Sequence, residues 1–453
     1  MSSPAPASNI HLAEIVGALS YALDITEGQP AGHSIRCCWI GMHIGRRLGL
    51  ADAALSDLYY TLLLKDVGCS SNAARLCQLY LANDLQFKSD YKFIYHTLPQ
   101  LLGFILSHTG MKENLAERFR AIIHIARNGG EISRELIETR CTRGAEIARQ
   151  MRFSETVARG ILDLDEHWNG KGQPLRLAGE AIALGARIAL LAQVIDVFFK
   201  SGGPRAAMRE IRQRKGDWFD PALVDLFEHI AGDPDFWVGL GSADIEARVL
   251  ALEPVQHVAT LDDDYLDDIA AGFAKVVDSK SPYTSGHSDR VALFSDMIAE
   301  AMGLSPDSRR WLKRAALLHD IGKLGVSNQV LDKPGRLDNA EFDEVKRHPV
   351  LGETILSRIA AFADMARVAA THHEKLDGTG YPRGLAAPDL PLETRIVTTA
   401  DIFDALTADR PYRAAMPVAK AFEIMSGMVG TALDPACFAA LQQAVDRIDR
   451  EAA

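Results

Sequence analysis

Histidine and aspartate residues recur in short polar motifs in the second half of this 453-residue chain. Imidazole and carboxylate are the ligands that first-row transition metals prefer. In an adjacent His-Asp pair, the histidine can bind one ion while the two carboxylate oxygens span two ions. Such a pair stands at His319-Asp320, and adjacent His372-His373 has the same use. We therefore predict a dinuclear metal site whose ligands are His287, His319, Asp320, His348, His372, His373 and Asp401.

Two metals about 3.5–4 Å apart can hold a bridging hydroxide, make it nucleophilic at neutral pH and clamp phosphate oxygens during in-line attack. This chemistry favours phosphodiester hydrolysis. Lys323 lies one helical turn beyond Asp320, so its ammonium is expected to neutralise a phosphate oxygen as charge builds on it. Asp404 follows Asp401 by three residues on one predicted helix. It either supports the ligands or accepts the leaving group's proton, and a structural helix-capping role is the alternative. Asp320, Lys323 and Asp404 are the candidate catalytic residues.

These motifs together resemble the signature of the HD-GYP family. They occur in the family's order as Tyr-Thr-Ser-Gly-His at 283–287, Leu-His-Asp-Ile-Gly-Lys at 318–323, His-His-Glu-Lys-Leu-Asp-Gly-Thr-Gly-Tyr-Pro at 372–382 and Ala-Asp-Ile-Phe-Asp-Ala-Leu-Thr at 400–407. The resemblance implies a metal-dependent hydrolase of a bacterial second messenger, a cyclic dinucleotide and chiefly cyclic di-GMP. His348 has little local context of its own, but it stands at the spacing that the family uses for a ligand.

The resemblance also implies a phosphate-binding loop. Gly378 and Gly380 permit a tight turn beside the ligands that presents Tyr381. The family's Arg-Pro-Tyr-Lys segment corresponds here to 410–413, with Arg410 kept and Arg413 in place of lysine. Because arginine can hold phosphate in a bidentate fork, this departure need not weaken binding. The substrate-binding candidates are therefore Lys323, Gly380, Tyr381, Arg410 and Arg413.

The predicted number of metals depends on one departure from the family. Family members with three metals carry a glutamate four residues before the first motif histidine, and this chain has Tyr283 there. Tyrosine is a poor substitute for a bridging carboxylate. We therefore expect two divalent transition metal ions, whose identity among iron, manganese, nickel and zinc stays open.

The first half of the chain repeats the second with most ligands replaced. Gly32-His33 parallels Gly286-His287 and Lys65-Asp66 parallels His319-Asp320 at one offset, while 165–174 parallels 373–382 at a smaller offset. In this alignment Lys65, Arg140, Leu164, Asp165 and Gln193 stand where His319, His348, His372, His373 and Asp401 stand in the second copy. We expect 1–250 to be a degenerate, metal-free HD-GYP-like domain and 255–453 to be the catalytic HD-GYP domain. A different ligand set in the first copy is the alternative. Lys65, Arg140 and Lys171 either bind an anion such as a nucleotide or form ordinary ion pairs.

Composition and periodicity set the fold class. Apolar residues recur at spacings of three and four, which predicts an all-α chain of two tandem HD-like helical bundles. The stretches with this spacing are 11–24, 54–66, 117–126, 289–302, 309–319 and 351–372. The stretch 181–199 contains Arg187, Gln193 and Asp196, so a buried helix explains it better than a membrane span.

The formal charge of −11 argues against a DNA or RNA polymer as partner. Six cysteines without a Cys-X-X-Cys pair and the lack of a signal peptide favour a cytoplasmic protein.

The leading functional hypothesis is a phosphodiesterase that opens cyclic di-GMP or 3′,3′-cyclic GMP-AMP to a linear dinucleotide. The alternatives are an HD-type phosphohydrolase acting on another nucleotide and a non-catalytic cyclic dinucleotide sensor. No membrane partner is expected. The first domain is expected to act as a packing platform, through which the chain forms a homodimer.

Overall fold

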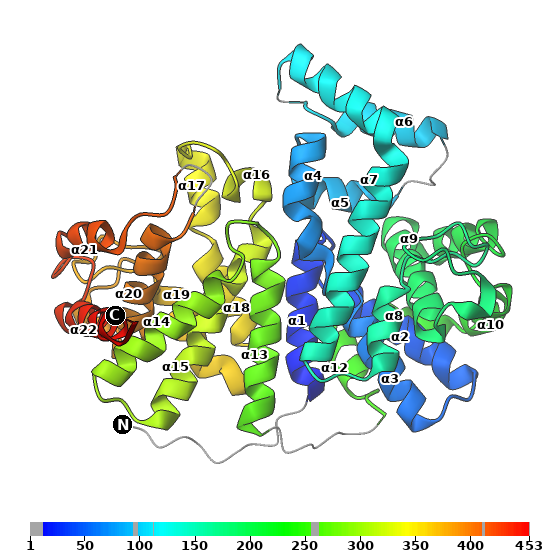
Figure 1. Cartoon of the computed structure of the whole chain (residues 1–453). Coiled ribbons are helices and arrows are strands. Elements are labelled where there is room, and N and C mark those ends of the chain that lie inside the picture. The colour runs from blue at the N-terminus through cyan, green and yellow to red at the C-terminus, as the bar shows by residue number, and fades with distance from the viewer. Residues whose placement is uncertain (1–11, 94–97, 112, 255–261, 410–412, 453) are drawn as a thin grey trace. The chain divides into compact units, whose positions relative to one another are not determined.

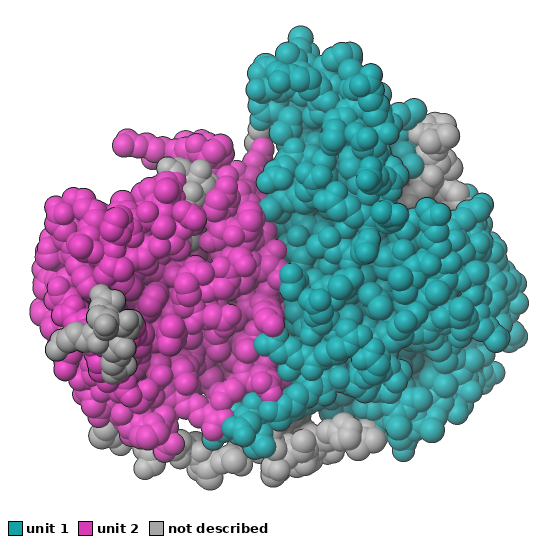
Figure 2. All heavy atoms as spheres, in the orientation of Figure 1, with its two compact units in different colours: residues 1–265 teal, residues 266–453 magenta. Residues whose placement is uncertain are grey.

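A computed structural model describes residues 12–93, 98–111, 113–254, 262–409 and 413–452. The chain divides into two compact units, unit 1 at Met1–Tyr265 and unit 2 at Leu266–Ala453, coloured separately in Figure 2. Every regular element among the described residues is a helix, and only three isolated β-bridges occur there. The predicted all-α fold class is confirmed. Across the described residues, every helix is too short or too polar to traverse a bilayer.

Unit 1 surrounds a buried core with helices of very different lengths (Figure 1). The structure places them at α1 Leu12–Thr26, α2 His33–Arg47, α3 Asp52–Leu64, η1 Cys69–Asn72, α4 Ala73–Tyr80, α5 Asp84–Tyr91, α6 Leu98–His108, α7 Leu115–Gln150, α8 Glu155–Leu162, η2 Gly179–Ala181, α9 Leu184–Gln213, α10 Pro221–Ala231, α11 Pro234–Leu240 and α12 Ile245–Leu250. Helix α9 contains the stretch 181–199 from Leu184 onward and buries most of it, as the sequence predicted.

Unit 2 takes up α13 from Leu266 onward and continues through α14 to α22 (Figure 1). Its elements are α13 Asp263–Asp278, α14 His287–Ala301, α15 Pro306–Leu318, η3 Ile321–Gly325, α16 Asn328–Leu331, α17 Asn339–Val345, α18 His348–Leu356, η4 Ala360–Met365, α19 Ala366–Thr371, η5 Ala387–Asp389, α20 Leu392–Thr407, α21 Val418–Ser426 and α22 Pro435–Ala452. The two units meet in sequence inside α13, near the predicted boundary.

Five of the six predicted helical stretches are confirmed, and one is wrong. The stretch 351–372 is not continuous, because Ile359 adopts an extended backbone (φ −110, ψ 108) and Ala360–Met365 winds as a 3-10 helix. Phe362 and Met365 are still buried there. A 3-10 turn also returns apolar residues to one face every third position, so the spacing alone could not reveal the break.

Helix α2 of unit 1 and helix α14 of unit 2 both begin after a glycine with left-handed backbone torsions. Gly32 before α2 and Gly286 before α14 have φ of 82 and 67, a left-handed conformation that suits glycine. Each glycine turns the chain so that the next residue, a histidine, opens the helix fully buried. In both units the following helix, α3 or α15, ends immediately before the pair Lys65-Asp66 or His319-Asp320.

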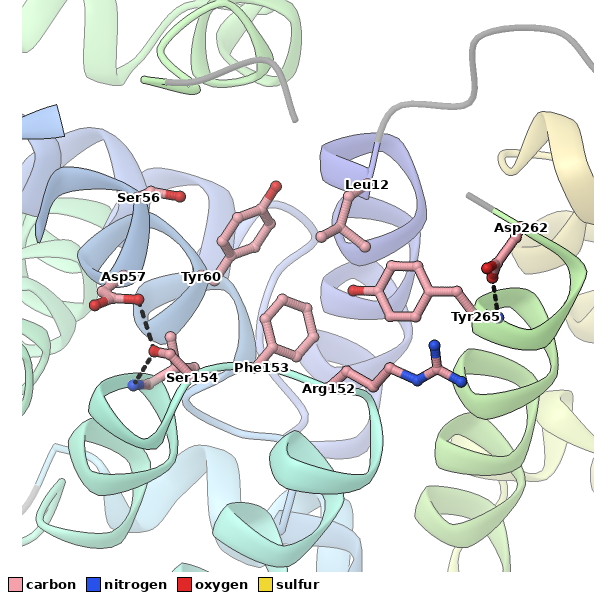
Figure 3. Close-up of a pocket in the computed structure, with 10 residues that line it drawn as sticks. Leu12, Ser56, Asp57, Tyr60, Arg152, Phe153, Ser154, Asp262 and Tyr265 are labelled. Carbon is pink, nitrogen blue, oxygen red and sulfur yellow. Dashed lines mark hydrogen bonds between the residues drawn. The ribbon is translucent and has the colours of Figure 1, made fainter. Parts of the chain in front are cut away.

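Helix α3 is held in place within unit 1 by its contact with α8 (Figure 3). Ser154 caps α8 by accepting a hydrogen bond from the Val157 amide, and its hydroxyl donates to Asp57 on α3 at 2.6 Å. Beside this contact, the Tyr60 and Phe153 rings pack 5.1 Å apart. These contacts fix the helix that carries Lys65 and Asp66 at its end.

Candidate metal centre and active site

The structure brings all seven predicted ligands together inside unit 2. His287 opens α14, His319 and Asp320 follow α15, His348 opens α18, His372 and His373 follow α19, and Asp401 lies on α20. The ligand atoms form two groups with metal-binding spacing. One group is His287, His319 and Asp401, and the other is Asp320, His348, His372 and His373.

Asp320 lies between the two groups and faces both. Its Oδ2 is 3.2 Å from His287 Nε2 and 3.3 Å from His319 Nε2. Its Oδ1 is 3.3 Å from His348 Nε2 and 3.6 Å from His372 Nε2. The two oxygens of this carboxylate therefore face different groups of imidazoles.

Four of the histidines present the same nitrogen to the centre. His319, His348 and His372 each place Nδ1 2.6–2.9 Å from the carbonyl three residues earlier. His287 places Nδ1 2.7 Å from Asp404 Oδ2. Because carbonyl and carboxylate oxygens only accept, Nδ1 must carry the proton and Nε2 keeps its lone pair. All four rings are therefore oriented as metal ligands.

The donor set fits a metal ion. His287 Nε2, His319 Nε2 and Asp320 Oδ1 are buried atoms without a hydrogen-bond partner. Buried polar atoms are rarely left unpaired unless an ion or another group satisfies them. Here the unpaired atoms are the Nε2 atoms of His287 and His319 in the first group and the oxygen of Asp320 that faces the second group.

The electrostatics of the centre also favour a cation. Burial alone would lower the pKa of His287, but the Asp320 and Asp404 carboxylates beside the ring outweigh burial and raise that pKa to about 9, which favours a positive charge at Nε2, either a proton or a metal ion. Burial lowers the pKa of His348 to about 3. The carboxylates thus draw positive charge to the first group, while the second keeps a neutral imidazole, the form that binds metal.

Lys323 lies at the edge of the centre, where its ammonium forms an ion pair with Asp320. Its side chain keeps 17% of its surface exposed, so it also reaches the side open to solvent. The Lys323 ammonium therefore lies between the Asp320 carboxylate and solvent.

The glycine-rich loop packs tightly against the second ligand group. A Cβ on Gly380 would lie 2.4 Å from the Glu374 Cα, so only glycine fits. The Tyr381 ring stacks on His373 with centroids 4.8 Å apart. Glu374, which sequence reasoning missed, is buried and accepts hydrogen bonds from the backbone amides of Arg383 and Leu385. These contacts place the tyrosine directly beside a predicted ligand.

The predicted phosphate-binding arginines have different outcomes. Arg413 donates to the carbonyls of Ala405 and Leu406 at the end of α20, so in this structure it binds backbone. Arg410 lies outside the described residues.

Asp404 contacts the predicted ligand His287. Its Oδ2 is 2.7 Å from His287 Nδ1, and its other oxygen pairs with Arg290. Burial would raise the pKa of Asp404, but hydrogen bonds to His287 and Arg290 outweigh it and lower the pKa to about 2. Of the roles left open by the sequence, this contact fits the one that supports the ligands. Sequence reasoning missed Arg290, although Arg36 at the matching place of the first copy was a signal.

Unit 1 repeats these supporting contacts. His33 Nδ1 is 2.7 Å from Asp196 Oδ2, and Arg36 holds the other oxygen of that carboxylate. A Cβ on Gly68 would lie 2.0 Å from the Arg140 carbonyl oxygen, as one on Gly322 would lie 1.9 Å from that of His348. The positions that the sequence aligned therefore occupy equivalent places in the two units.

Unit 1 contains two groups of side chains whose potential ligand atoms lie close enough together to hold a metal ion. One group is His33, Cys37 and Asp196, and the other is Glu27, Asp66 and Cys69. Their carboxylates are already engaged, since Asp196 pairs with His33 and Arg36, and Glu27 with Lys88 and Lys92. Burial raises the pKa of the Cys37 and Cys69 thiols, which opposes the thiolate form that binds metal. Lys171 is exposed.

An all-helical bundle with a buried His-Asp cage is the architecture of HD-domain metal-dependent phosphohydrolases. The HD domain family model matches residues 120–223 and 273–437, one segment in each unit. The chain belongs to this family and, as the motifs predicted, to its HD-GYP phosphodiesterases.

Curated relatives include 3′3′-cGAMP-specific phosphodiesterase 3 of Vibrio cholerae, which is 55% identical over 97% of this chain and 96% of its own length. The cyclic di-GMP phosphodiesterase response regulator RpfG of Xanthomonas campestris is 39% identical over 37% of this chain and 45% of its own length. The crystal structure of a V. cholerae cyclic GMP-AMP-specific phosphodiesterase (V-cGAP3) matches with a TM-score of 0.64 and 50% identity, covering 96% of this chain and 98% of that chain.

Proposed function

We propose that this protein hydrolyses 3′,3′-cyclic GMP-AMP to a linear dinucleotide at a two-metal centre in unit 2. The family makes the chain a cyclic dinucleotide phosphodiesterase that binds divalent metal. The observation that carries the two-metal proposal is the position of Asp320 between two groups of ligands. The relative specific for cyclic GMP-AMP matches both units, whereas the cyclic di-GMP phosphodiesterase RpfG matches only 37% of the chain. This favours the mixed dinucleotide as substrate.

The residues of unit 2 have distinct roles in this proposal. His287, His319 and Asp401 would hold one ion, His348, His372 and His373 would hold the other, and Asp320 would contribute an oxygen to each. When bound, the ions supply a hydroxide nucleophile and clamp the phosphate oxygens. Lys323 neutralises charge that develops on the phosphate, and Tyr381, held by the loop around Glu374, lines the substrate side. Asp404 keeps the Nδ1 proton of His287 in place, so that Nε2 faces the ion.

The alternatives differ in what the site would have to do. A silent sensor would not require two complete ligand groups, so two groups with metal-ligand spacing, buried apart from His373 and Asp401, favour an enzyme. A phosphohydrolase for another nucleotide has no support among the curated relatives described above, all of which are cyclic dinucleotide phosphodiesterases by name.

The proposal is tested with metal-loaded full-length protein. The protein is incubated separately with 3′,3′-cyclic GMP-AMP, cyclic di-GMP and cyclic di-AMP, and linear products are followed by chromatography, with Asp320→Ala as the control. We expect the mixed dinucleotide to be opened fastest and the control to be inactive. Faster opening of cyclic di-GMP would refute the substrate, and tight binding of every compound without turnover would support a sensor.

For the two domains, we propose that 255–453 is the catalytic part and 1–250 a metal-free part that also mediates homodimerisation. The support for a dimer is a group of large apolar side chains in the α6–α7 region that are 49–83% exposed. They are Phe93, Leu102, Leu106, Met111, Leu115 and Phe119. Exposed apolar surface of this kind typically marks a protein interface. Phe119→Glu should convert a dimer to a monomer in light scattering, while a wild-type monomer would contradict the proposal.

A further inference from the structure

The ammonium of Lys65 lies among the residues of unit 1 that correspond to the first ligand group of unit 2. Its Nζ is 3.2 Å from His33 Nε2 and 3.1 Å from Gln193 Oε1, and it forms an ion pair with Asp66. These three partners align with His287, Asp401 and Asp320. The Lys65 side chain has no solvent-exposed surface.

The local geometry is prepared for a cation at this place. Asp196 accepts from His33 Nδ1, so His33 Nε2 keeps its lone pair and directs it at Lys65. In unit 2 the equivalent carboxylate, Asp404, fixes the equivalent lone pair in the same way. One supporting contact therefore serves an ammonium in unit 1 and a predicted metal in unit 2.

A second cation lies where the other ligand group would be. Arg140, at the place of His348, forms an ion pair with Asp165, which stands at the place of His373. Its Nη1 also lies 3.8 Å from the Cys69 sulfur. The remaining position is taken by Leu164, which is buried and offers no ligand atom.

We propose that unit 1 carries its own cations in place of both metals, with Lys65 at the first position and Arg140 at the second. The inference rests on the two-metal function proposed for unit 2. An ammonium has three donors, and those of Lys65 meet three acceptors, His33, Asp66 and Gln193. None is left for a phosphate, so Lys65 is a permanent structural cation, and the position that it fills binds neither metal nor nucleotide.

The test restores ligands in unit 1 of the full-length protein. Lys65→His with Gln193→Asp recreates the first group as two histidines and two carboxylates. Wild type and variant are loaded with Mn²⁺, dialysed and analysed for metal per chain, and their melting temperatures are compared with and without chelator. We expect about one additional ion in the variant and a chelator-sensitive stability of unit 1 that wild type lacks. Gln193→Asp alone, which keeps the ammonium, should gain no ion.

A second pair of variants tests the role of Lys65 through protein stability alone, in case the protein with the restored ligands does not fold. Lys65→Met leaves the buried Asp66 carboxylate without its counter-ion and should lower the melting temperature by several degrees. Lys65→Met with Asp66→Asn removes both charges and should recover much of that loss.

The outcomes separate this inference from the proposed function. A variant with the wild-type metal content and a chelator-insensitive unit 1 overturns the inference, as does a Lys65→Met protein as stable as wild type or not rescued by Asp66→Asn. A wild-type protein that retains no metal in unit 2 refutes the proposed function instead, and leaves the rescue experiment informative about Lys65.

Discussion

Replacing Asp404 with asparagine tests whether this residue orients a metal ligand. The carboxylate uses both oxygens, because Oδ2 accepts from His287 Nδ1 at 2.7 Å while Oδ1 accepts from Arg290 Nε. Asparagine has almost the same shape but replaces one acceptor by a donating amide. Either His287 loses the contact that fixes its tautomer, or Arg290 faces a donor.

The expected cost follows from the burial of the pair. Both side chains, His287 and Asp404, are 1% exposed, so water cannot replace the lost acceptor. Losing a residue that orients a metal-bound histidine typically weakens metal affinity by about 10–100-fold, or about 1.4–2.7 kcal/mol. We expect a loss of this size, with a helical spectrum like that of wild type. Metal affinity is measured by titration against a chelating indicator, and folding by circular dichroism.

Unit 1 supplies a matched control in Asp196→Asn. Asp196 makes the same two contacts, to His33 Nδ1 at 2.7 Å and to Arg36 Nε at 2.6 Å, in a unit predicted to hold no metal. This control should change stability but not metal affinity. Unchanged affinity in Asp404→Asn, or an equal loss in both variants, would refute the orienting role.

Three further predictions concern the centre and its counterpart. Asp320→Ala should abolish turnover and lower metal content. Folded Asp66→Ala should keep the chemical step. Equal losses of product formation in the two variants would implicate unit 1 in the chemistry. Lys323→Ala should lower kcat by about 10²–10³-fold at constant metal content, and a rise in KM alone would make the lysine a ground-state binder. Acid should destabilise unit 1. Burial and the Lys65 charge lower the pKa of His33 from 6.5 to about 4, so the free energy of unfolding should fall as the pH falls from 6.5 to about 4. Burial would raise the pKa of Glu27, but Lys92 and Lys88 outweigh it and lower that pKa from 4.5 to about 2. The loss of stability should therefore continue as the pH falls from 4.5 to about 2. Glu27→Gln should flatten the plot of melting temperature against pH in that range.

The clustering of the candidate ligands could be predicted from sequence because metal chemistry restricts residue type and the motifs keep several candidates adjacent. The pair His319-Asp320 follows the last residue of α15, and at this helix end Asp320 lies close to imidazoles of both predicted ligand groups. The atoms that orient the imidazoles were beyond this reasoning. Three are backbone carbonyls, such as that of Ala316, which no side-chain pattern records. Arg290 needed the folded distance to Asp404, which lies 114 positions away.

The helix prediction failed where packing overrode periodicity. Apolar residues continue from 351 to 372, but the backbone turns at Ile359 and proceeds as a 3-10 helix. The break separates His348, which opens α18, from His372, which follows α19. It lets the two imidazoles approach with their Nε2 atoms 3.3 Å apart. A straight helix with a rise of about 1.5 Å per residue would hold residues 24 positions apart roughly 36 Å from each other.

The two units show that the same buried carboxylates can be neutralised in two ways. In unit 2 Asp320 faces four imidazole nitrogens, a set that suits ions with vacant coordination positions. In unit 1 Asp66 meets the tethered ammonium of Lys65, whose donors are already engaged. An ammonium balances charge, but it has no vacant orbital with which to bind a hydroxide or polarise a phosphate. With lysine at the position of His319 and the supporting contacts of His33 kept, we therefore expect unit 1 to keep the fold without the chemistry proposed for unit 2.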